Sequence, residues 1–455
     1  MGRPALPHHG AVGGGRRRRV RPLHALLPRR QHEVLGQRAD PPAPGGLRRP
    51  RARRRRVAGL ADRLRDPGPV LRPCGGPLRR ARAGRRRPHR AALRAVSTCR
   101  CRTRAAGAGH RRRAPAQGLR PFHLPLGVRA PGESDGCVLC NTCNSFPCRL
   151  GAKSDAEACA VAPVLGRPNL TLWTGAEARR LLTNPSGTRV EAIEIQRRGR
   201  LERVEAPLVV VSCGAVNSAA LLLRSASDRH PRGLANSSDL VGRRYMAHLA
   251  TMMQGFHPFR RNDTVFQKTV ALNDYYFEGP DAPHPLGHIQ SQGRTHGIMA
   301  KVVGDTIIPG IPLGAYDAWV ARGVDWLAMS EDLPRRDNRV SLTPDGRIRL
   351  DYVPNNVAAH DQLVAAATRM LKKLGYWKVM RHSHQARNTT HQCGTCCFGT
   401  DPATSVLDPY CRTHDVENLF VVDASFFPSS AAVNPGLTII AQALRVADHI
   451  RATAL

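Results

Sequence analysis

The chain has 455 residues and a formal net charge of +36, and most of that charge lies in one segment. Residues 1–120 contain 34 Arg, no Lys and four acidic residues, so this segment carries +30 (34 minus 4). It contains no Phe, Tyr, Trp, Ile or Asn. A segment of this composition cannot bury enough apolar surface to offset its chain entropy, so residues 1–117 are predicted to be disordered.

Three interpretations of the Arg-rich segment stay open. A basic arm could bind nucleic acid or an anionic surface, but no aromatic side chains are present to stack on bases. A targeting peptide would need a compact apolar region, and none follows the first basic residues. The third interpretation is a G/C-rich gene translated in the wrong frame, because the missing residue types are those with A/T-rich codons. The charge alone therefore gives no reason to expect a nucleic-acid partner.

Cysteine usage and hydropathy bear on the compartment. Thirteen Cys, an odd number, without a visible signal peptide argue against a disulfide framework. No run of about 18 apolar residues occurs, so no membrane span is predicted. The expected location is the cytoplasm.

Ordinary composition begins near residue 118, and the next elements alternate between strand and helix patterns. Residues 151–165 are predicted to form a helix and residues 169–184 a strand that ends in a turn. VEAIEIQRRG (190–199) and LERVEAPLVVVSCG (201–214) have strand patterns. Residues 209–226 form a strand, a small-residue turn and a helix. This order is typical of an α/β layer with a largely parallel sheet.

Residues 246–350 differ, with scattered strands and long loops. RVSLTPDGRIRLDYVP (339–354) predicts a hairpin around a Pro-Asp-Gly turn. Residues 358–375 predict an amphipathic helix that Gly375 ends. Residues 391–455 return to an α/β pattern, with a strand and a closing helix.

The C-terminal segment carries the most specific motif. HQCGTCCFGTDPATSVLD starts at His391, NLFVVDASFFP follows it, and Asn434-Pro435 opens the last helix. The pattern is similar to that of the glucose–methanol–choline (GMC) oxidoreductases, which are FAD-dependent: His-x-x-Gly-Thr, then Leu-x-Val-x-Asp-[AG]-Ser, then Asn-Pro. Weaker support comes from GAK at 151–153 and from EDLPRRDNRVSL at 331–342. The resemblance covers residues 118–455.

The resemblance implies an α/β fold (α+β overall). A Rossmann-like FAD-binding layer would be interleaved with an antiparallel-sheet substrate domain. Residues 118–245 and 386–455 would belong to the FAD-binding domain, and residues 246–385 would form the substrate-binding domain.

The same resemblance implies oxidation of a CH–OH group in an alcohol or sugar-like substrate. His391 would take the hydroxyl proton while hydride passes to flavin N5, because histidine titrates near neutrality. Asn434 would orient the substrate oxygen and stabilise its developing charge. The simpler alternatives are a turn histidine bonded to backbone and an Asn N-cap with Pro435 at the first helical position. Oxygen, a quinone and a carrier protein all stay open as electron acceptors.

Five further residues match cofactor positions of the family: Ala178, Asp423, Ala424, Pro435 and Gly436. Ala178 corresponds to a backbone contact with the adenine. Asp423 and Ala424 correspond to the ribityl–pyrophosphate region, and Pro435 and Gly436 to the positive end of the last helix, which faces the flavin ring. The alternative for Asp423 is an acid that caps a turn.

One family feature is missing. No Gly-x-Gly-x-x-Gly follows a strand, and GAVGGG at 10–15 has Val12 where the second Gly is required. Poor or absent FAD binding by the chain is therefore one expectation. The alternative function is a non-catalytic scaffold with a basic arm for nucleic acid or membrane.

Cys137, Cys140, Cys143 and Cys148 have the spacing C-x2-C-x2-C-x4-C, which is typical of a zinc or iron–sulfur site. Some flavin dehydrogenases of this broad family carry an iron–sulfur centre. Reduced thiols or a local disulfide are the alternatives, and the main prediction is that no metal is bound.

Overall fold

The structure is a computed structural model that describes residues 98–99, 113–143, 146–277, 284–304, 309–383 and 389–453. Most of the segment 1–117 lies outside the described residues, and so do the basic runs on which its three interpretations rest. Within that segment, β1 (Thr98–Cys99) pairs with β3 (Leu126–Gly127), and η3 (Pro115–Gln117) is a short 3-10 helix.

The largest sheet has six strands, and every neighbouring pair that the structure describes is antiparallel. In spatial order these are β14 (Lys378–Ser383), β8 (Leu249–Phe256), β11 (Gly323–Ser330), β10 (His288–Ser291), β9 (Val270–Leu272) and β2 (Phe122–His123). All eight residues of the central strand β11 are buried, so both of its faces are covered. The antiparallel sheet predicted for this part of the chain is confirmed.

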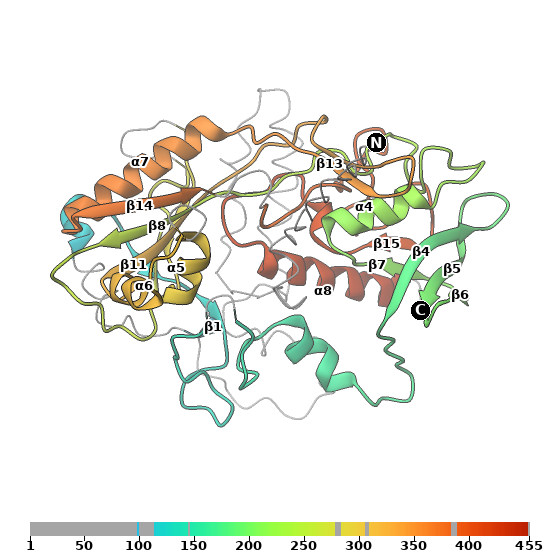
Figure 1. Cartoon of the computed structure of the whole chain (residues 1–455). Coiled ribbons are helices and arrows are strands. Elements are labelled where there is room, and N and C mark those ends of the chain that lie inside the picture. The colour runs from blue at the N-terminus through green and yellow to red at the C-terminus, as the bar shows by residue number, and fades with distance from the viewer. Residues whose placement is uncertain are drawn as a thin grey trace, which may run out of the picture. The chain divides into compact units, whose positions relative to one another are not determined.

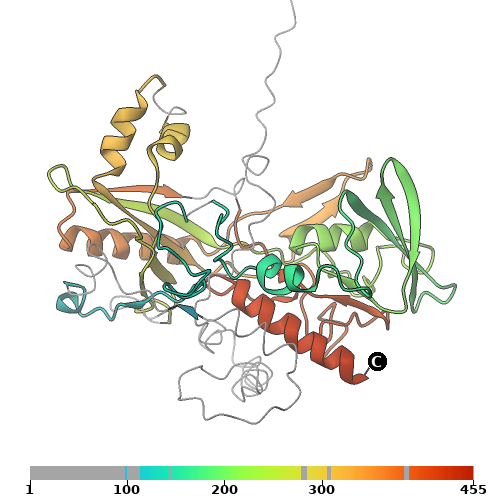
Figure 2. The same cartoon turned by 90° about the horizontal axis from the view of Figure 1, so that it is seen from below.

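Helices cover the two faces of this sheet. α7 (Val357–Lys373) packs on β8, β11 and β14 (Figure 1). α5 (Gly297–Gly304) and α6 (Leu313–Val320) lie on the opposite side (Figure 2). Gly375 follows α7 with φ 96, a left-handed conformation that glycine adopts without strain, so the predicted helix end is confirmed.

The α/β layer is built from elements far apart in the sequence. β7 (Val209–Val211) runs through Gly214 into α4 (Ala215–Arg224), and β7 pairs in parallel with β15 (Leu419–Val421). α8 (Gly436–Thr453) is the closing helix. The predicted strand–Gly–helix unit is confirmed, but the expectation of a largely parallel sheet is corrected. β7 and β15 are the only named strands in the described ranges that pair in parallel.

Other sheets are small. β4 (Ala176–Thr183), β5 (Val190–Arg197) and β6 (Arg200–Glu205) form an antiparallel sheet, and β12 (Arg339–Leu342) and β13 (Ile348–Asp351) form the predicted Pro-Asp-Gly hairpin.

Two predicted elements differ from the structure. The helix expected at 151–165 is one π-helical turn, η4 (Glu157–Val161), and one 3-10 turn, η5 (Ala162–Val164). The strand expected from residue 169 begins only at Ala176. A strand pattern forms a strand only where another strand is present to pair with it, and residues 169–175 have no such partner in the described sheets.

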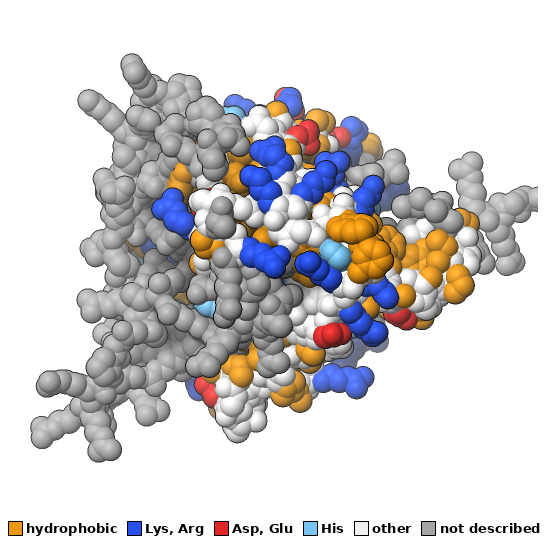
Figure 3. Space-filling view, turned by 90° about the vertical axis from the view of Figure 1, so that its left-hand side faces the viewer, with side chains coloured by type: hydrophobic (Ala, Val, Ile, Leu, Met, Phe, Trp, Pro, Cys, Tyr) orange, Lys and Arg blue, Asp and Glu red, His pale blue; other side chains and the backbone are white. Residues whose placement is uncertain are grey.

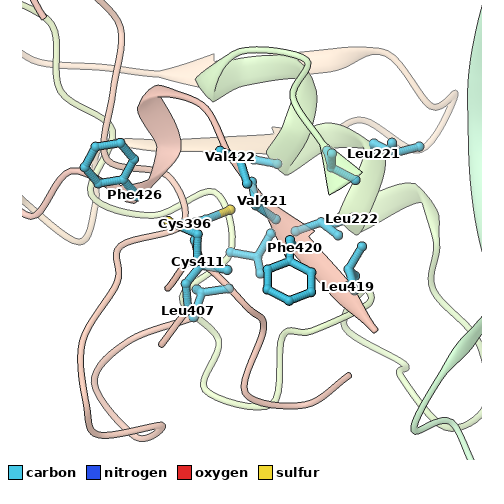
Figure 4. Packing of buried hydrophobic residues seen from close by; sticks show 14 of the residues in the cluster. Leu221, Leu222, Cys396, Leu407, Cys411, Leu419, Phe420, Val421, Val422 and Phe426 are labelled. Atoms are coloured by element: carbon cyan, nitrogen blue, oxygen red, sulfur yellow. The ribbon is translucent and has the colours of Figure 1, made fainter. Parts of the chain in front are cut away.

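A hydrophobic core cluster packs α4 against β7 and β15 and against the turns of the segment 393–411 (Figure 4). Leu222 of α4 is fully buried there, as are Leu419 and Val421 of β15. The cluster therefore holds the C-terminal motif in place through side chains of α4.

The surface seen from the side of α7 and β14 carries Lys and Arg side chains around hydrophobic ones, with few acidic side chains (Figure 3). Within the described ranges, no helix combines the length and the apolarity that crossing a membrane requires.

The buried position of Leu222 yields a stability prediction. Leu222→Ala should lower the free energy of unfolding by about 2–5 kcal/mol, because it removes methyl groups from a closed core and leaves a cavity. Urea unfolding followed by circular dichroism measures this. Leu201→Ala on β6, where the side chain is 57% exposed, is the control and should change the value by about 0.5 kcal/mol or less. Equal losses in the two variants would contradict the packing described above.

Candidate active site

The site forms where residues 246–248 run antiparallel to residues 390–393. Met246 and Cys393 exchange two backbone hydrogen bonds of 3.0 and 2.9 Å, and the His248 N–H donates to Thr390 O at 3.2 Å. His391 adopts φ 56, in the left-handed region. This pairing brings two imidazoles together, with 2.8 Å between the Nδ1 atoms of His248 and His391.

Asn434 lies on the other side of the His391 ring. Its Nδ2 is 3.3 Å from His391 Nε2, although the residues are 43 positions apart in the sequence. The residue sits two positions before α8, with Pro435 between. The structure therefore brings together the two side chains that the motif predicted as a pair.

Hydrogen-bonding partners fix where the ring protons lie. His248 Nε2 is 2.9 Å from Ser430 O, a carbonyl that only accepts, so Nε2 carries the proton. Burial lowers the pKa of His248 to about 4, so the ring is neutral at physiological pH and its Nδ1 is an acceptor. His391 must then donate from Nδ1 to His248, and a neutral His391 presents Nε2 as an acceptor toward Asn434.

Ser429 and Ser430 anchor the turn that supplies the carbonyl. The Asp332 N–H donates to Ser430 Oγ at 2.9 Å, and Ser429 Oγ donates to Glu331 Oε1. Burial raises the pKa of Asp332 to about 6. These bonds join the end of β11 to the segment before Asn434, so the carbonyl that sets the His248 tautomer is held by both parts of the site.

Gly394 lets the motif approach its neighbours closely. It has φ 91, and a Cβ at this position would lie 2.5 Å from Arg244 O and 2.5 Å from Met246 Cε. Its N–H donates to Ala424 O at 3.1 Å. Thr395 Oγ1 donates to Ala215 O at 2.6 Å and fixes the start of α4. A larger residue at position 394 would collide with the Arg244 carbonyl oxygen, two residues before the paired segment 246–248.

Asp423 is a junction between three elements. Its carboxylate accepts hydrogen bonds from the Gly214 N–H, from Ser218 Oγ and from the Ser425 N–H. The last of these bonds caps the start of η6 (Ala424–Phe426). The side chain therefore performs the capping role that was the simpler alternative. Ala424 is buried, and its carbonyl accepts a hydrogen bond from the Gly394 N–H.

The residues present fit the ring end of a flavin. The start of α8 at Gly436 has N–H groups without a partner inside the helix, and it carries partial positive charge beside Asn434. Pro435 and Gly436 are half-buried. Ala178, the residue matched to the adenine contact, lies in β4 away from the ring-end residues in sequence, is partly buried and packs against the core cluster that contains Ala424.

The residues present do not fit the phosphate end of FAD. The described strand–turn–helix unit of the parallel layer is β7–Gly214–α4, and Asp423 already binds the Gly214 N–H at 3.0 Å. A carboxylate at this position occupies the donor that a phosphate would need and repels a second anion. The missing glycine loop noted in the sequence is not replaced by these residues.

The cysteine-rich loop is held by hydrogen bonds. Lys153 Nζ donates to Cys143 O at 2.9 Å and to Phe146 O at 2.8 Å. A hydrogen bond with Thr142 lowers the pKa of the Cys140 thiol. None of the four cysteines of the loop is in a disulfide, and the described part of the chain contains no group of three or more His, Cys, Asp or Glu that could hold a metal ion. The geometry gives no support to an iron–sulfur centre.

His248 is the functional candidate that the sequence did not reveal. It lies in a segment without a recognised motif, and its partner His391 is 143 residues away. A buried histidine at the start of a strand is more often a core residue. His248 therefore becomes a functional candidate only when the pairing of residues 246–248 with residues 390–393 is known.

The close approach at Gly394 can be tested by comparing two glycines. Gly394→Ala and Gly346→Ala both place Cβ at a positive φ, but a Cβ at Gly346 has no atom within 4 Å. Gly346→Ala should lower the free energy of unfolding by about 1 kcal/mol, and Gly394→Ala by about 2 kcal/mol more because backbone must move. Thermal unfolding measures both. Equal losses would mean that the contact at Gly394 relaxes without cost.

Family profiles of the GMC oxidoreductases match residues 116–250 and 334–443. The chain is 34% identical over 361 residues to 6'''-hydroxyparomomycin C oxidase of Streptomyces lividus and 34% identical over 356 residues to paromamine 6'-oxidase of Streptomyces fradiae. In each case 74% of this chain and 62% of the relative are covered, so the chain spans less than two thirds of these relatives' length.

A solved structure shows the same fold. The crystal structure of pyridoxine 4-oxidase from Mesorbium loti matches with a TM-score of 0.54 at 18% identity, over 76% of this chain and 69% of that one. At this identity the match shows the mixed α/β fold alone. Together with the two profile matches and the sequence identity to the two Streptomyces oxidases, it leads to one conclusion: this chain belongs to the GMC oxidoreductase family.

Proposed function

We propose that this chain oxidises the CH–OH group of a small-molecule alcohol or sugar-like substrate with FAD, the cofactor that GMC oxidoreductases bind. The observation that carries the proposal is the His391–Asn434 pair. The hydrogen bond from His391 Nδ1 to His248 leaves His391 Nε2 as an acceptor on the side of Asn434. The names of the relatives support the substrate class, since they include a paromamine oxidase and a choline oxidase.

His391 acts as the base. Its Nε2 lone pair takes the hydroxyl proton, the O–H bond breaks, and the resulting imidazolium is stabilised by its Nδ1–H bond to His248. The chemistry that FAD supplies when bound is acceptance of the hydride that leaves the carbon. Proton and hydride together account for the two electrons and two protons lost when an alcohol becomes a carbonyl.

Asn434 orients the substrate oxygen. Its amide lies 3.3 Å from His391 Nε2, a long contact that a substrate hydroxyl can replace. An amide N–H directed at this oxygen stabilises the negative charge that develops as the proton leaves. Asn434 and His391 would therefore bind the same oxygen from two sides.

The proposed FAD contacts come from five further residues: Ala178, Asp423, Ala424, Pro435 and Gly436. Pro435 and Gly436 would hold the pyrimidine edge of the ring at the start of α8, where the helix dipole favours negative charge. Asp423 would contribute backbone contacts, because its carboxylate is bound by three protein donors. Ala178 and Ala424 would also contribute backbone contacts, because alanine has no polar side chain. The cytoplasmic location stays a prediction, and oxygen, a quinone and a carrier protein all stay open as electron acceptors.

The base is tested by His391→Asn. In FAD-loaded protein, this variant should lower kcat/KM for alcohol oxidation by about 10²- to 10⁴-fold, because the proton acceptor is removed. Anaerobic bleaching of flavin absorbance by an alcohol measures the rate. His382→Asn on the exposed end strand β14 is the control and should leave the rate unchanged. An unchanged rate in His391→Asn would refute the assignment.

The role of His248 is tested by two substitutions with amide side chains, each of which reproduces the hydrogen bonding of one ring nitrogen. His248→Asn keeps an acceptor near the Nδ1 position and should retain a proton on His391 Nδ1. His248→Gln keeps a donor near the Nε2 position for Ser430 O, loses the acceptor, and should shift the His391 proton to Nε2 in a measurable fraction of molecules. Correlation of imidazole nitrogen and hydrogen resonances by NMR reports the tautomer without cofactor. The same tautomer in both variants would contradict the role.

A further inference from the structure

Two exposed aromatic side chains meet where three elements of the large sheet and its helix end. β8 ends at Phe256, α7 ends at Lys373 and β14 begins at Lys378. In the turns beside these ends, Phe259 is 79% exposed and Trp377 is 63% exposed. Their ring centroids are 5.2 Å apart, and the two rings stand edge to face at 83°. Single exposed apolar side chains are common on proteins, whereas large apolar side chains in mutual contact indicate an interaction surface.

Hydrogen bonds hold both turns in place. The Trp377 N–H donates to Phe256 O at 3.1 Å, and the His257 N–H donates to Arg322 O at 3.2 Å. Arg322 Nε donates in turn to Pro258 O at 3.1 Å. The buried ring of His257 lies beneath Trp377, with 5.5 Å between their centroids. The two exposed aromatic side chains are therefore presented by ordered turns, so little chain entropy is lost when they bind.

Positive charge surrounds the two rings. Residues 257–263 and 372–378 contain five Lys or Arg and one acid, a net charge of +4 (5 minus 1) with His neutral. The acid, Asp263, lies 3.5 Å from Arg261, and both side chains are largely exposed, so the pair is weak. Figure 3 shows this side of the molecule, where Lys and Arg surround hydrophobic side chains. We call these two segments the basic aromatic patch; its five cations are all exposed: Arg260, Arg261, Lys372, Lys373 and Lys378.

This combination of side chains suits the surface of an anionic bilayer. Tryptophan collects at the boundary between membrane and water, because its ring is apolar and its N–H is polar. Each Lys or Arg near an anionic bilayer strengthens binding by about fivefold. The long stems of these side chains contact apolar groups while their charges stay among the lipid headgroups.

We propose that the basic aromatic patch docks this chain on the surface of an anionic phospholipid bilayer. Phe259 and Trp377 insert among the headgroups, and the five surrounding cations bind lipid phosphates. The contact is peripheral and needs no helix that spans the membrane. It is independent of the proposed function, and its test requires neither FAD nor an alcohol.

Three other occupants fit the patch less well. Two rings at 83° to each other cannot both stack on neighbouring bases of a nucleic acid that lie parallel. A second copy would bring two patches of the same charge together across a two-fold axis. The two segments have 14 residues together (7 plus 7), fewer than the about 20–30 that a stable protein interface takes from each partner.

Quenching of tryptophan fluorescence by brominated phospholipids measures contact of Trp377 with lipid. The full chain is titrated with vesicles of brominated phosphatidylcholine, with and without phosphatidylserine. The chain has four Trp, so the signal of Trp377 is the difference between the parent chain and Trp377→Phe. Half-maximal quenching of Trp377 should need about tenfold less lipid, or lower still, when phosphatidylserine is present. Residues 1–120 contain no Trp, so vesicle binding through their Arg side chains alone would leave Trp377 unquenched.

Matched variants provide the controls. Phe259→Asp places a negative charge where an apolar ring should insert, and it should raise the lipid needed to quench Trp377 by about tenfold or more. Leu201→Asp changes an apolar side chain of β6 that is 57% exposed, and it should leave this value unchanged. Trp173→Phe removes another exposed tryptophan, 40% exposed, and should retain the Trp377 signal. Circular dichroism confirms that the variants fold.

Each result supports or overturns the docking surface. Quenching of Trp377 that depends on phosphatidylserine and is lost in Phe259→Asp would uphold it. Vesicle binding without quenching of Trp377, or equal quenching with and without phosphatidylserine, would overturn it. A change of Trp377 fluorescence with single-stranded polyuridylate but not with vesicles would assign the patch to nucleic acid and overturn it. A change that depends only on protein concentration would assign the patch to a second copy, with the same consequence.

Discussion

The hydrogen bond between His248 and His391 holds the candidate site together. Its 2.8 Å length depends on the antiparallel contact of residues 246–248 with residues 390–393, and therefore on Gly394, which permits that contact. A buried neutral histidine cannot lend charge to its partner, but it can dictate which nitrogen of the partner carries the proton. The chemistry proposed for His391 follows from this choice, because a base needs its lone pair at Nε2, on the side of Asn434.

Asp423 links this site to the α/β layer. By binding Gly214, Ser218 and Ser425 it fixes the start of α4 to the end of β15, and through Ala424 it positions Gly394. The same bonds remove Gly214 from the set of donors that could bind phosphate. The reactive end of the site is thus well supported, while the parallel sheet beside it has only β7 and β15 among the described strands.

Local signals predicted the elements whose form depends on nearby residues. The Pro-Asp-Gly turn between β12 and β13, the end of α7 at Gly375 and the strand–Gly–helix unit at β7 and α4 are examples. The His391–Asn434 pair, 43 positions apart, was predicted only through the resemblance of the C-terminal segment to the GMC pattern. The strand expected from residue 169 needs a partner strand, which no local pattern supplies, and His248 needs a contact 143 residues away. Both depend on long-range pairing, which a single sequence does not show.

The chemistry proposed for His391 requires an unprotonated Nε2 that faces the substrate oxygen. Neutron diffraction from crystals of the full chain at neutral pH locates these hydrogens directly. We expect hydrogen on His391 Nδ1 and on His248 Nε2, with none on His391 Nε2. Hydrogen on His391 Nε2, with Nδ1 bare toward His248, would contradict this assignment.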